Sequence, residues 1–359
     1  MTTPTLLDPA ARRRRAIGWA TSAVLLVLAV LFPVLADSNY LVAVASLALT
    51  YMVIAQSLNL VFGYAGFFAL GITVPWVVGG YVTAVLTRTH EWETVPALLA
   101  GAVGGALVMA LFGLATLGRG RNSFAILSLV LMLFVEILVR TWTEVTGGGA
   151  GIANLPVIDL GFTDIVTPTE FYYFTLAVVA LIMLAMWAMV SSRWGRTLRA
   201  TKGDELLAAS MGVSLLHHRV LVLAIASAFC GLVGGIHVLR ISVAVPSMAG
   251  LEYLAPLLAI IFIGGPGNFL GVVMASVVVT FIPELARGFD EWRQFIYGGL
   301  LVVLCLLFPL GIPARFTQLV GAWRARRAAR PGHGSDAAET TDPSTEPTAP
   351  VDAEKELVR

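Results

Sequence analysis

Long apolar runs alternate with short polar segments along most of the chain. A transmembrane helix needs about 20 predominantly apolar residues. Nine apolar runs approach or exceed this length, and a tenth, Leu251–Ile263, is shorter. The pattern predicts an all-α, polytopic integral membrane protein with about nine to ten transmembrane helices. The nine longer runs are Ile17–Leu35, Tyr40–Phe62, Phe67–Leu86, Val95–Leu117, Phe124–Val139, Phe171–Val190, Val220–Leu239, Gly267–Leu285 and Phe295–Leu310.

Two of these runs allow more than one interpretation. Leu251–Ile263 is short and stands between "PSMAG" and "GGPGN", so we expect a broken or re-entrant segment, which requires protein or water to cover its backbone. The first run follows "ARRRR" and precedes "VLADS", as a secretory signal cleaved after Ala36 would. Signal cores span about 7–15 residues, and because this run is longer we expect an uncleaved first helix.

Basic residues predict the orientation. If all ten runs cross, sixteen lysines and arginines gather in one set of alternate segments and five in the other. Cytoplasmic segments are the basic ones, so both termini and the segment 193–219 are predicted to be cytoplasmic. This organisation comprises a basic N-terminus at 1–16, a transmembrane domain at 17–312, a basic flank at 313–330 and a disordered tail at 331–359 that is rich in Pro, Ser, Thr and Glu.

Composition supports the membrane assignment and excludes several functions. Hydrophobic residues make up 58% of the chain and charged residues 13%, against about 45–50% and 25% in soluble domains. Lipid is therefore an expected partner, and the net charge of +1 indicates no nucleic-acid partner. The only cysteines, Cys230 and Cys305, lie within apolar runs, where packing is a better explanation than a disulfide or a metal site.

The stretch "TKGDELLAASMGVS", Thr201–Ser214, differs from the apolar runs around it. Thr201 and Asp204 have capping-box spacing and Gly212 suits a helix C-terminus, so a helix Lys202–Met211 is predicted. So short a helix persists only when it packs on something. Its apolar stripe, Leu207 and Met211, and its small residues suit docking to a partner, but a connector that folds back on its own helices is the alternative.

Several motifs resemble a known family. "RATKGDELLAASMGVSLLHHRVLVLA" is similar to the cytoplasmic coupling loop of ABC importer permeases. "SLNLVFGYAG", "VTGGGAGI", "GGPGNFLG" and "WRQFIYGGLLVVLCLLFPLGI" resemble segments of the branched-chain amino acid permease subunits, and together the matches span Tyr40–Ile312. The resemblance implies ATPase-coupling residues at Glu205, Ala208, Ala209 and Gly212, to which the apolar stripe adds Leu207 and Met211. It also implies an external loop that contains Thr146, Gly147 and Gly148.

The resemblance also implies partners: a second permease subunit, two ABC ATPase subunits and an extracytoplasmic solute-binding protein. A P-loop needs a lysine after its second glycine, whereas Lys202 follows Thr201 and Lys355 follows Glu354. ATP must therefore act on separate subunits, and we expect a transporter subunit that is not itself an enzyme and carries no cofactor or metal.

Candidate pathway residues come from "LNLVFGYAGFFALG", Leu58–Gly71, which joins the second run to the third. Asn59, Gly63, Tyr64 and Gly66 break its apolar character, and a broken helix can offer backbone carbonyls to a polar solute. Close packing of helices through small residues is the alternative for the glycines. Glu136 is a carboxylate inside an apolar run, which suggests function, although an ion pair with Arg140, four residues later, would also explain it.

These observations predict a permease subunit of an ABC importer in the cell membrane. Branched-chain or related small amino acids are the expected substrates, with urea or short amides as the alternative. An ion-coupled secondary transporter is a less favoured reading, because such proteins usually need titratable or oxygen-rich sites near the membrane midplane, and we expect none there apart from Glu136. No set of residues typical of a membrane-embedded enzyme occurs.

Overall fold

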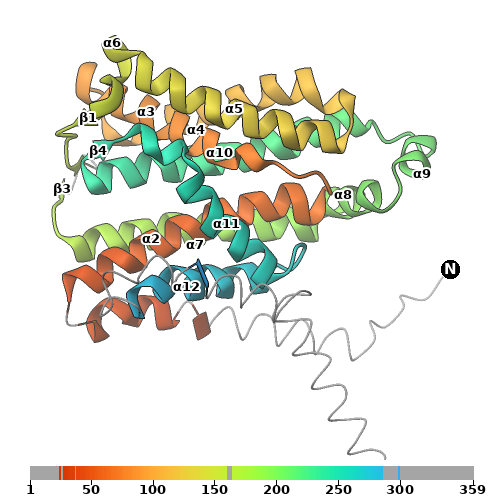
Figure 1. Ribbon diagram of the computed structural model, residues 1–359. Helices are drawn as coiled ribbons and strands as arrows, with labels where there is room; N and C mark the ends of the chain where they lie inside the picture. The colour runs from red at the N-terminus through yellow and green to blue at the C-terminus, as the bar shows by residue number, and fades with distance from the viewer. Residues whose placement is uncertain (1–23, 26, 37, 160–163, 286–297, 300–359) are drawn as a thin grey trace, which may run out of the picture. The chain divides into compact units, whose positions relative to one another are not determined.

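The computed structural model describes residues 24–25, 27–36, 38–159, 164–285 and 298–299 (Figure 1). Seven helical segments of this described part are long and apolar enough to cross a membrane. They are Asn39–Tyr64, Leu70–Thr89, Thr94–Thr116, Ser123–Thr141, Pro168–Ser191, Leu215–Ile241 and Pro246–Gly264. A shorter apolar stretch, Phe269–Ile282, follows. The fold is thus the all-α, polytopic one that the apolar pattern predicts.

The helices that build these segments begin and end within a few residues of the predicted runs. They are α2 (Asn39–Leu58), α3 (Thr73–Thr89), α4 (Thr94–Thr116), α5 (Arg121–Thr141), α7 (Pro168–Ser191), α10 (Leu215–Ile241), α11 (Leu251–Gly264) and α12 (Phe269–Leu285). Residues 24–25 and 27–35 of the first predicted span are helical. The rest of that span, nearly all of Phe295–Leu310, and the segments 1–16, 313–330 and 331–359 lie outside the described residues.

The segment Leu251–Ile263 lies within the continuous helix α11. With the 3-10 turn η5 (Pro246–Ala249) before it, the apolar segment reaches 19 residues, and the extended backbone of Gly250 breaks it between the two. The short apolar run concealed this length, because "PSMAG" reads as a loop in sequence but forms a helical turn. A longer interruption lies between α2 and α3.

Three helices meet through glycine at the centre of the fold. A Cβ added to Gly79 on α3 would lie 2.3 Å from the Cα of Gly231 on α10, and one added to Gly231 would lie 2.6 Å from the carbonyl oxygen of Gly101 on α4. Any side chain there would force the backbones apart. Small residues allow membrane helices to approach closely enough for extensive van der Waals contact, so these glycines set the spacing of α3, α4 and α10. Cys230 is buried beside them, as expected of a packing residue.

Outward surfaces of α4, α5 and α7 are apolar. Exposed leucines, valines and isoleucines follow these helices at helical spacing, for example Leu99, Val103 and Leu107 on α4. Such faces suit lipid or another membrane-embedded chain. The entry into α7 is defined by a capping box, in which the Thr167 hydroxyl accepts from the Glu170 amide at 3.2 Å and the Glu170 carboxylate accepts from the Thr167 amide at 3.1 Å.

Short strands tie connecting segments together at one end of the helices. The strand β1 (Ile152–Ala153), after α5, pairs with β4 (Val243–Ala244), after α10, and β2 (Ile158–Asp159) pairs with β3 (Asp164–Ile165). The helices α8 (Arg193–Gly203) and α9 (Glu205–Ser210) lie at the opposite end of α7 and α10 (Figure 1). Since β4 leads into α11, this helix runs from the strand end towards the end that carries α8.

Candidate coupling and translocation site

The second span loses regular helical structure where its glycines begin. After Leu58 the chain forms a π-helical turn, η1 (Asn59–Tyr64), and then continues without helix to Ala69 before the 3-10 turn η2 (Leu70–Ile72) starts the next span. Gly66 adopts φ +82°, a conformation that glycine reaches without steric cost. We call residues 59–69 the glycine break. Wide turns of this kind often occur at functional sites.

Polar side chains attach the glycine break to the loop between α11 and α12. The Asn59 Oδ1 accepts a 2.7 Å hydrogen bond from the amide of Gly267, and its Nδ2 donates to the Gln56 Oε1 at 2.8 Å. Gln56 in turn donates to the carbonyl of Phe269 at 2.8 Å. A Cβ at Gly63 would lie 2.4 Å from the Gly267 nitrogen. The two glycine segments that the sequence singled out therefore pack directly on each other.

Two basic residues of α8 also contact the glycine break. The Lys202 Nζ donates a 2.7 Å hydrogen bond to the carbonyl oxygen of Gly63, and the stem of Lys202 fills the space where Gly66 has no side chain. The guanidinium of Arg199 lies 5.8 Å from the centre of the Tyr64 ring, a cation–π contact. The structure thus brings together all four candidate pathway residues, which are Asn59, Gly63, Tyr64 and Gly66. They lie where the glycine break meets α8 and the loop between α11 and α12.

Sequence reasoning did not identify Lys202 and Arg199 as site residues. The available signal was their three-residue spacing within a basic amphipathic stretch, which places both on one helix face. It was overlooked because Lys202 was assigned to the start of the docking helix. Gln56, a polar residue one turn before Asn59 in an apolar run, was a second usable signal.

The predicted helix Lys202–Met211 is wrong in its boundaries. The structure has two helices: α8, whose N-cap is Ser192, continues through Thr201 to Gly203, and α9 begins after Asp204. Thr201 is buried inside α8 and donates to the Leu198 carbonyl. Asp204 is itself the N-cap, since its Oδ1 accepts from the Leu207 amide at 3.0 Å. Gly212 follows α9 with φ +82°, which agrees with its predicted place at the helix end.

The six candidate coupling residues divide between two faces. Glu205 forms an ion pair with Arg219 near the start of α10, and Ala208 is buried. Leu207 and Met211 are 63% and 79% exposed, as is the unpredicted Leu206 at 85%, and Ala209 is also exposed. We call Leu206, Leu207 and Met211 the α9 patch. Glu205 and Ala208 thus hold α9 to the protein, while the α9 patch faces outward.

The remaining candidates lie elsewhere. Glu136 on α5 accepts a 2.9 Å hydrogen bond from Arg140, so the structure contains the ion pair that sequence reasoning left as the alternative.

The Thr146 hydroxyl lies 2.6 Å from the carbonyl oxygens of Val139 and Trp142 and accepts from the Gly148 amide. Gly147 and Gly148 have φ of +73° and +63°, so the Thr-Gly-Gly loop is a compact turn at the strand end.

Comparisons with known proteins agree with this architecture. A family described as "Branched-chain amino acid transport system / permease component" matches residues 40–305. The high-affinity branched-chain amino acid transport system permease protein LivM of Salmonella typhimurium is 29% identical over 315 residues, covering 80% of this chain and 73% of the relative. LivM of Escherichia coli is 29% identical over the same shares.

A more distant relative carries a different substrate in its name. The ribose import permease protein RbsC of Escherichia coli is 23% identical over 285 residues, 74% of this chain and 81% of the relative. No solved structure matches the chain. The family match covers most of the chain and, apart from Asn39, the seven described segments that are long enough to cross a membrane. The ion-coupled alternative therefore falls away, and no cofactor belongs to a subunit of this kind. The chain is therefore a member of the branched-chain amino acid transport permease family, the membrane-embedded and non-catalytic permease component of an ABC importer.

Proposed function

We propose that this subunit translocates branched-chain or related small amino acids into the cell. Two ATPase subunits dock on the α9 patch, a second permease subunit completes the pathway, and an extracytoplasmic solute-binding protein delivers the substrate. Both termini, α8 and α9 face the cytoplasm, and the strand end faces outside. The observation that carries this proposal is the hydrogen bond from Lys202 to Gly63, because it connects the surface suited to docking with the interruption in a membrane span.

The contacts define a mechanical route. A displacement of α9 reaches α8 across the single residue Asp204, and Lys202 and Arg199 transmit it to the glycine break. The break then bears on α11 and α12 through Asn59 and Gly267. Because a π-helical turn is less regular than the α-helix before it, the break is the part of the span where a bend costs least. ATP-driven closure of the ATPases would thus change the tilt of several spans together.

The two LivM relatives support amino acids as the substrate class, since they are more similar to this chain than the ribose permease is. The relatives include permeases named for amino acids and one named for ribose, so the substrate of this chain needs a direct test. Urea and short amides stay as the alternative from the sequence.

The test is uptake by the assembled transporter in proteoliposomes. ATP-dependent accumulation of leucine, isoleucine or valine, with urea and ribose excluded, is the expected result. Uptake of urea in preference to leucine would replace the substrate assignment. Robust uptake by this chain alone, driven by an ion gradient without any ATPase, would contradict the whole proposal.

Orientation can be tested separately. Gly149 and Gly203 have open space around them, so a cysteine at either position should not disturb the fold. With the native cysteines replaced, a membrane-impermeant maleimide should label Gly149→Cys in intact cells and Gly203→Cys only after permeabilisation. The reverse pattern would invert the proposed orientation.

A further inference from the structure

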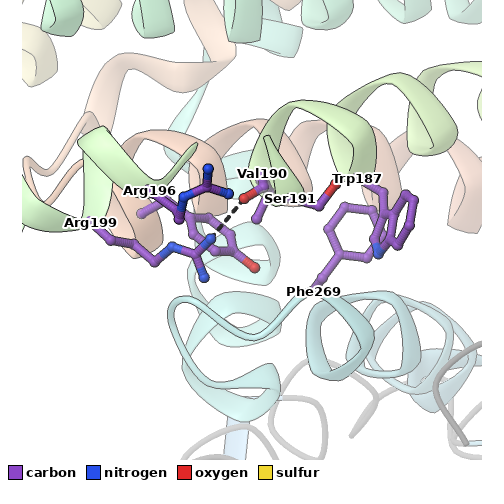
Figure 2. A pocket seen from close by; sticks show the side chains of 7 residues that line it. Trp187, Val190, Ser191, Arg196, Arg199 and Phe269 are labelled. Atoms are coloured by element: carbon purple, nitrogen blue, oxygen red, sulfur yellow. Dashed lines mark hydrogen bonds between the residues drawn. The ribbon is translucent and has the colours of Figure 1, made fainter. Parts of the chain in front are cut away.

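A cavity of about 630 Å³ opens beside the coupling segment, where the end of α7 meets α8, the glycine break and the start of α12 (Figure 2). Its volume is within the range of small-molecule sites. It is separate from the α9 patch, and nothing in the coupling route above requires it to be empty or filled. The residues that line it are Tyr64, Trp187, Val190, Ser191, Arg196, Arg199 and Phe269.

Two arginines give the cavity a positive wall. Figure 2 shows the side chains of Arg196 and Arg199 on one side and the rings of Trp187 and Phe269 on the other. Arg199 donates to the carbonyls of Val190 at 2.8 Å and Gly195 at 3.2 Å. The guanidinium of Arg196 forms no hydrogen bond or ion pair with any residue that the structure describes, and only its backbone amide is bonded, to the Ser192 carbonyl. None of the described residues that line the cavity is acidic, so its chemistry favours an anion.

The other wall is apolar and continues along α7. Trp187 lies one turn before the end of this membrane span, at the level where tryptophan is enriched at membrane interfaces. Leu184, three residues earlier, neighbours Trp187 on the helix surface, and Leu181, three residues before it, neighbours Leu184; both leucines are exposed. A ligand that fits both walls has an anionic head and a long apolar tail. Free inorganic anions would satisfy the arginines but would leave the apolar face unused.

We propose that this cavity binds the phosphate headgroup of an anionic phospholipid, from the leaflet on the α8 side, with its acyl chains along Leu184 and Leu181. Basic pockets between transmembrane helices bind acidic lipid headgroups by this combination of charge and apolar contact. The bound headgroup pairs with Arg196 and with the free edge of Arg199. Since Arg199 also contacts Tyr64, the lipid would stabilise α8 in the position from which Lys202 reaches Gly63.

The experiment is a lipid titration of the full-length chain in non-ionic detergent after delipidation, followed by thermal unfolding. Phosphatidylglycerol should raise the unfolding midpoint by about 4 °C near saturation, whereas phosphatidylcholine with identical acyl chains should give a much smaller shift. Arg196→Gln should lose the phosphatidylglycerol shift. Arg193→Gln, a charge change on the same helix outside the cavity, should keep it.

A second readout covers the case in which a variant folds poorly. Native mass spectrometry should show phosphatidylglycerol retained by the wild type and by Arg196→Lys, but not by Arg196→Gln. Equal effects of the two lipids, or an Arg196→Gln variant that behaves as the wild type, would overturn the proposal. Inorganic phosphate that reproduces the shift by itself would identify a free-anion site instead. Disulfide-linked dimers of Ser191→Cys in membranes would show that a second copy covers the cavity, and would also overturn it.

Discussion

The ammonium group of Lys202 donates a 2.7 Å hydrogen bond to the carbonyl oxygen of Gly63, 139 residues earlier in the chain. One partner belongs to a basic surface helix and the other to the π-helical turn that interrupts a membrane span. The bond therefore joins the two segments that the proposed mechanism needs to move together, and its removal is the most direct test of that mechanism.

Lys202→Met keeps the stem that packs on Gly66 and removes only the donor. A hydrogen bond with a charged donor contributes about 1.5–3 kcal/mol, so amino-acid uptake per ATP hydrolysed should fall by about tenfold or more. The measurement is uptake and ATPase activity in the same proteoliposomes. Arg193→Gln is the matched control, and an unchanged ratio in Lys202→Met would show that the bond does not carry the coupling.

Ala209→Trp tests whether α9 docks a partner. Ala209 is exposed, so a large side chain there should leave expression and thermal stability unchanged. In the assembled transporter it should obstruct the ATPase and abolish ATP-driven uptake. Co-purification of the ATPase subunits provides the measurement. Normal uptake by this variant would place the docking surface elsewhere.

Gly212→Val tests the end of α9. Gly212 has φ +82°, where an L-residue costs about 1–2 kcal/mol and a β-branched residue more. The strain should displace the α9 patch and uncouple ATP hydrolysis from uptake, while insertion into the membrane stays normal. Gly212→Asn, which tolerates this conformation, should retain most of the uptake. If valine and asparagine behave alike, the conformation of this residue is not important for coupling.

Gly231→Ala tests the contact between α3, α4 and α10. The added Cβ would lie 2.6 Å from the Gly101 carbonyl oxygen, so helices must separate, and overpacking of this kind costs about 1–3 kcal/mol. A lower unfolding midpoint and less protein in the membrane are expected. Gly118→Ala, with no atom within 4 Å of its Cβ, should behave as the wild type.

Glu136→Gln and Arg140→Gln together test the role of the carboxylate on α5. Exposed ion pairs contribute about 0–1 kcal/mol, and the Arg140 side chain is largely exposed. Both variants should therefore show the same small loss of stability and normal uptake. A strong loss of uptake in Glu136→Gln alone would restore the interpretation that this residue serves the translocation pathway.

The apolar pattern was sufficient to locate the described spans, because burial in lipid imposes a minimum length on every crossing. It did not show the full length of the segment around Leu251–Ile263, where a proline-led turn precedes the helix. The prediction that was wrong in its boundaries, Lys202–Met211, came from a capping motif. There, Thr201 and Asp204 have the spacing of a capping box, yet Ser192 caps an earlier helix that runs through Thr201. Several residues near a helix end can have the spacing of a cap, and the packing around them decides which one is the N-cap.

The sequence by itself determined the membrane class, the crossings, the family resemblance and the positions of the two glycine segments, since these follow from composition and short motifs. Only the tertiary structure decided that Asn59 contacts Gly267, that Lys202 reaches Gly63 and that Arg196 and Arg199 border a cavity with Trp187. Each of these contacts joins residues from separate helices. Their geometry depends on how the helices pack, and no local pattern records that.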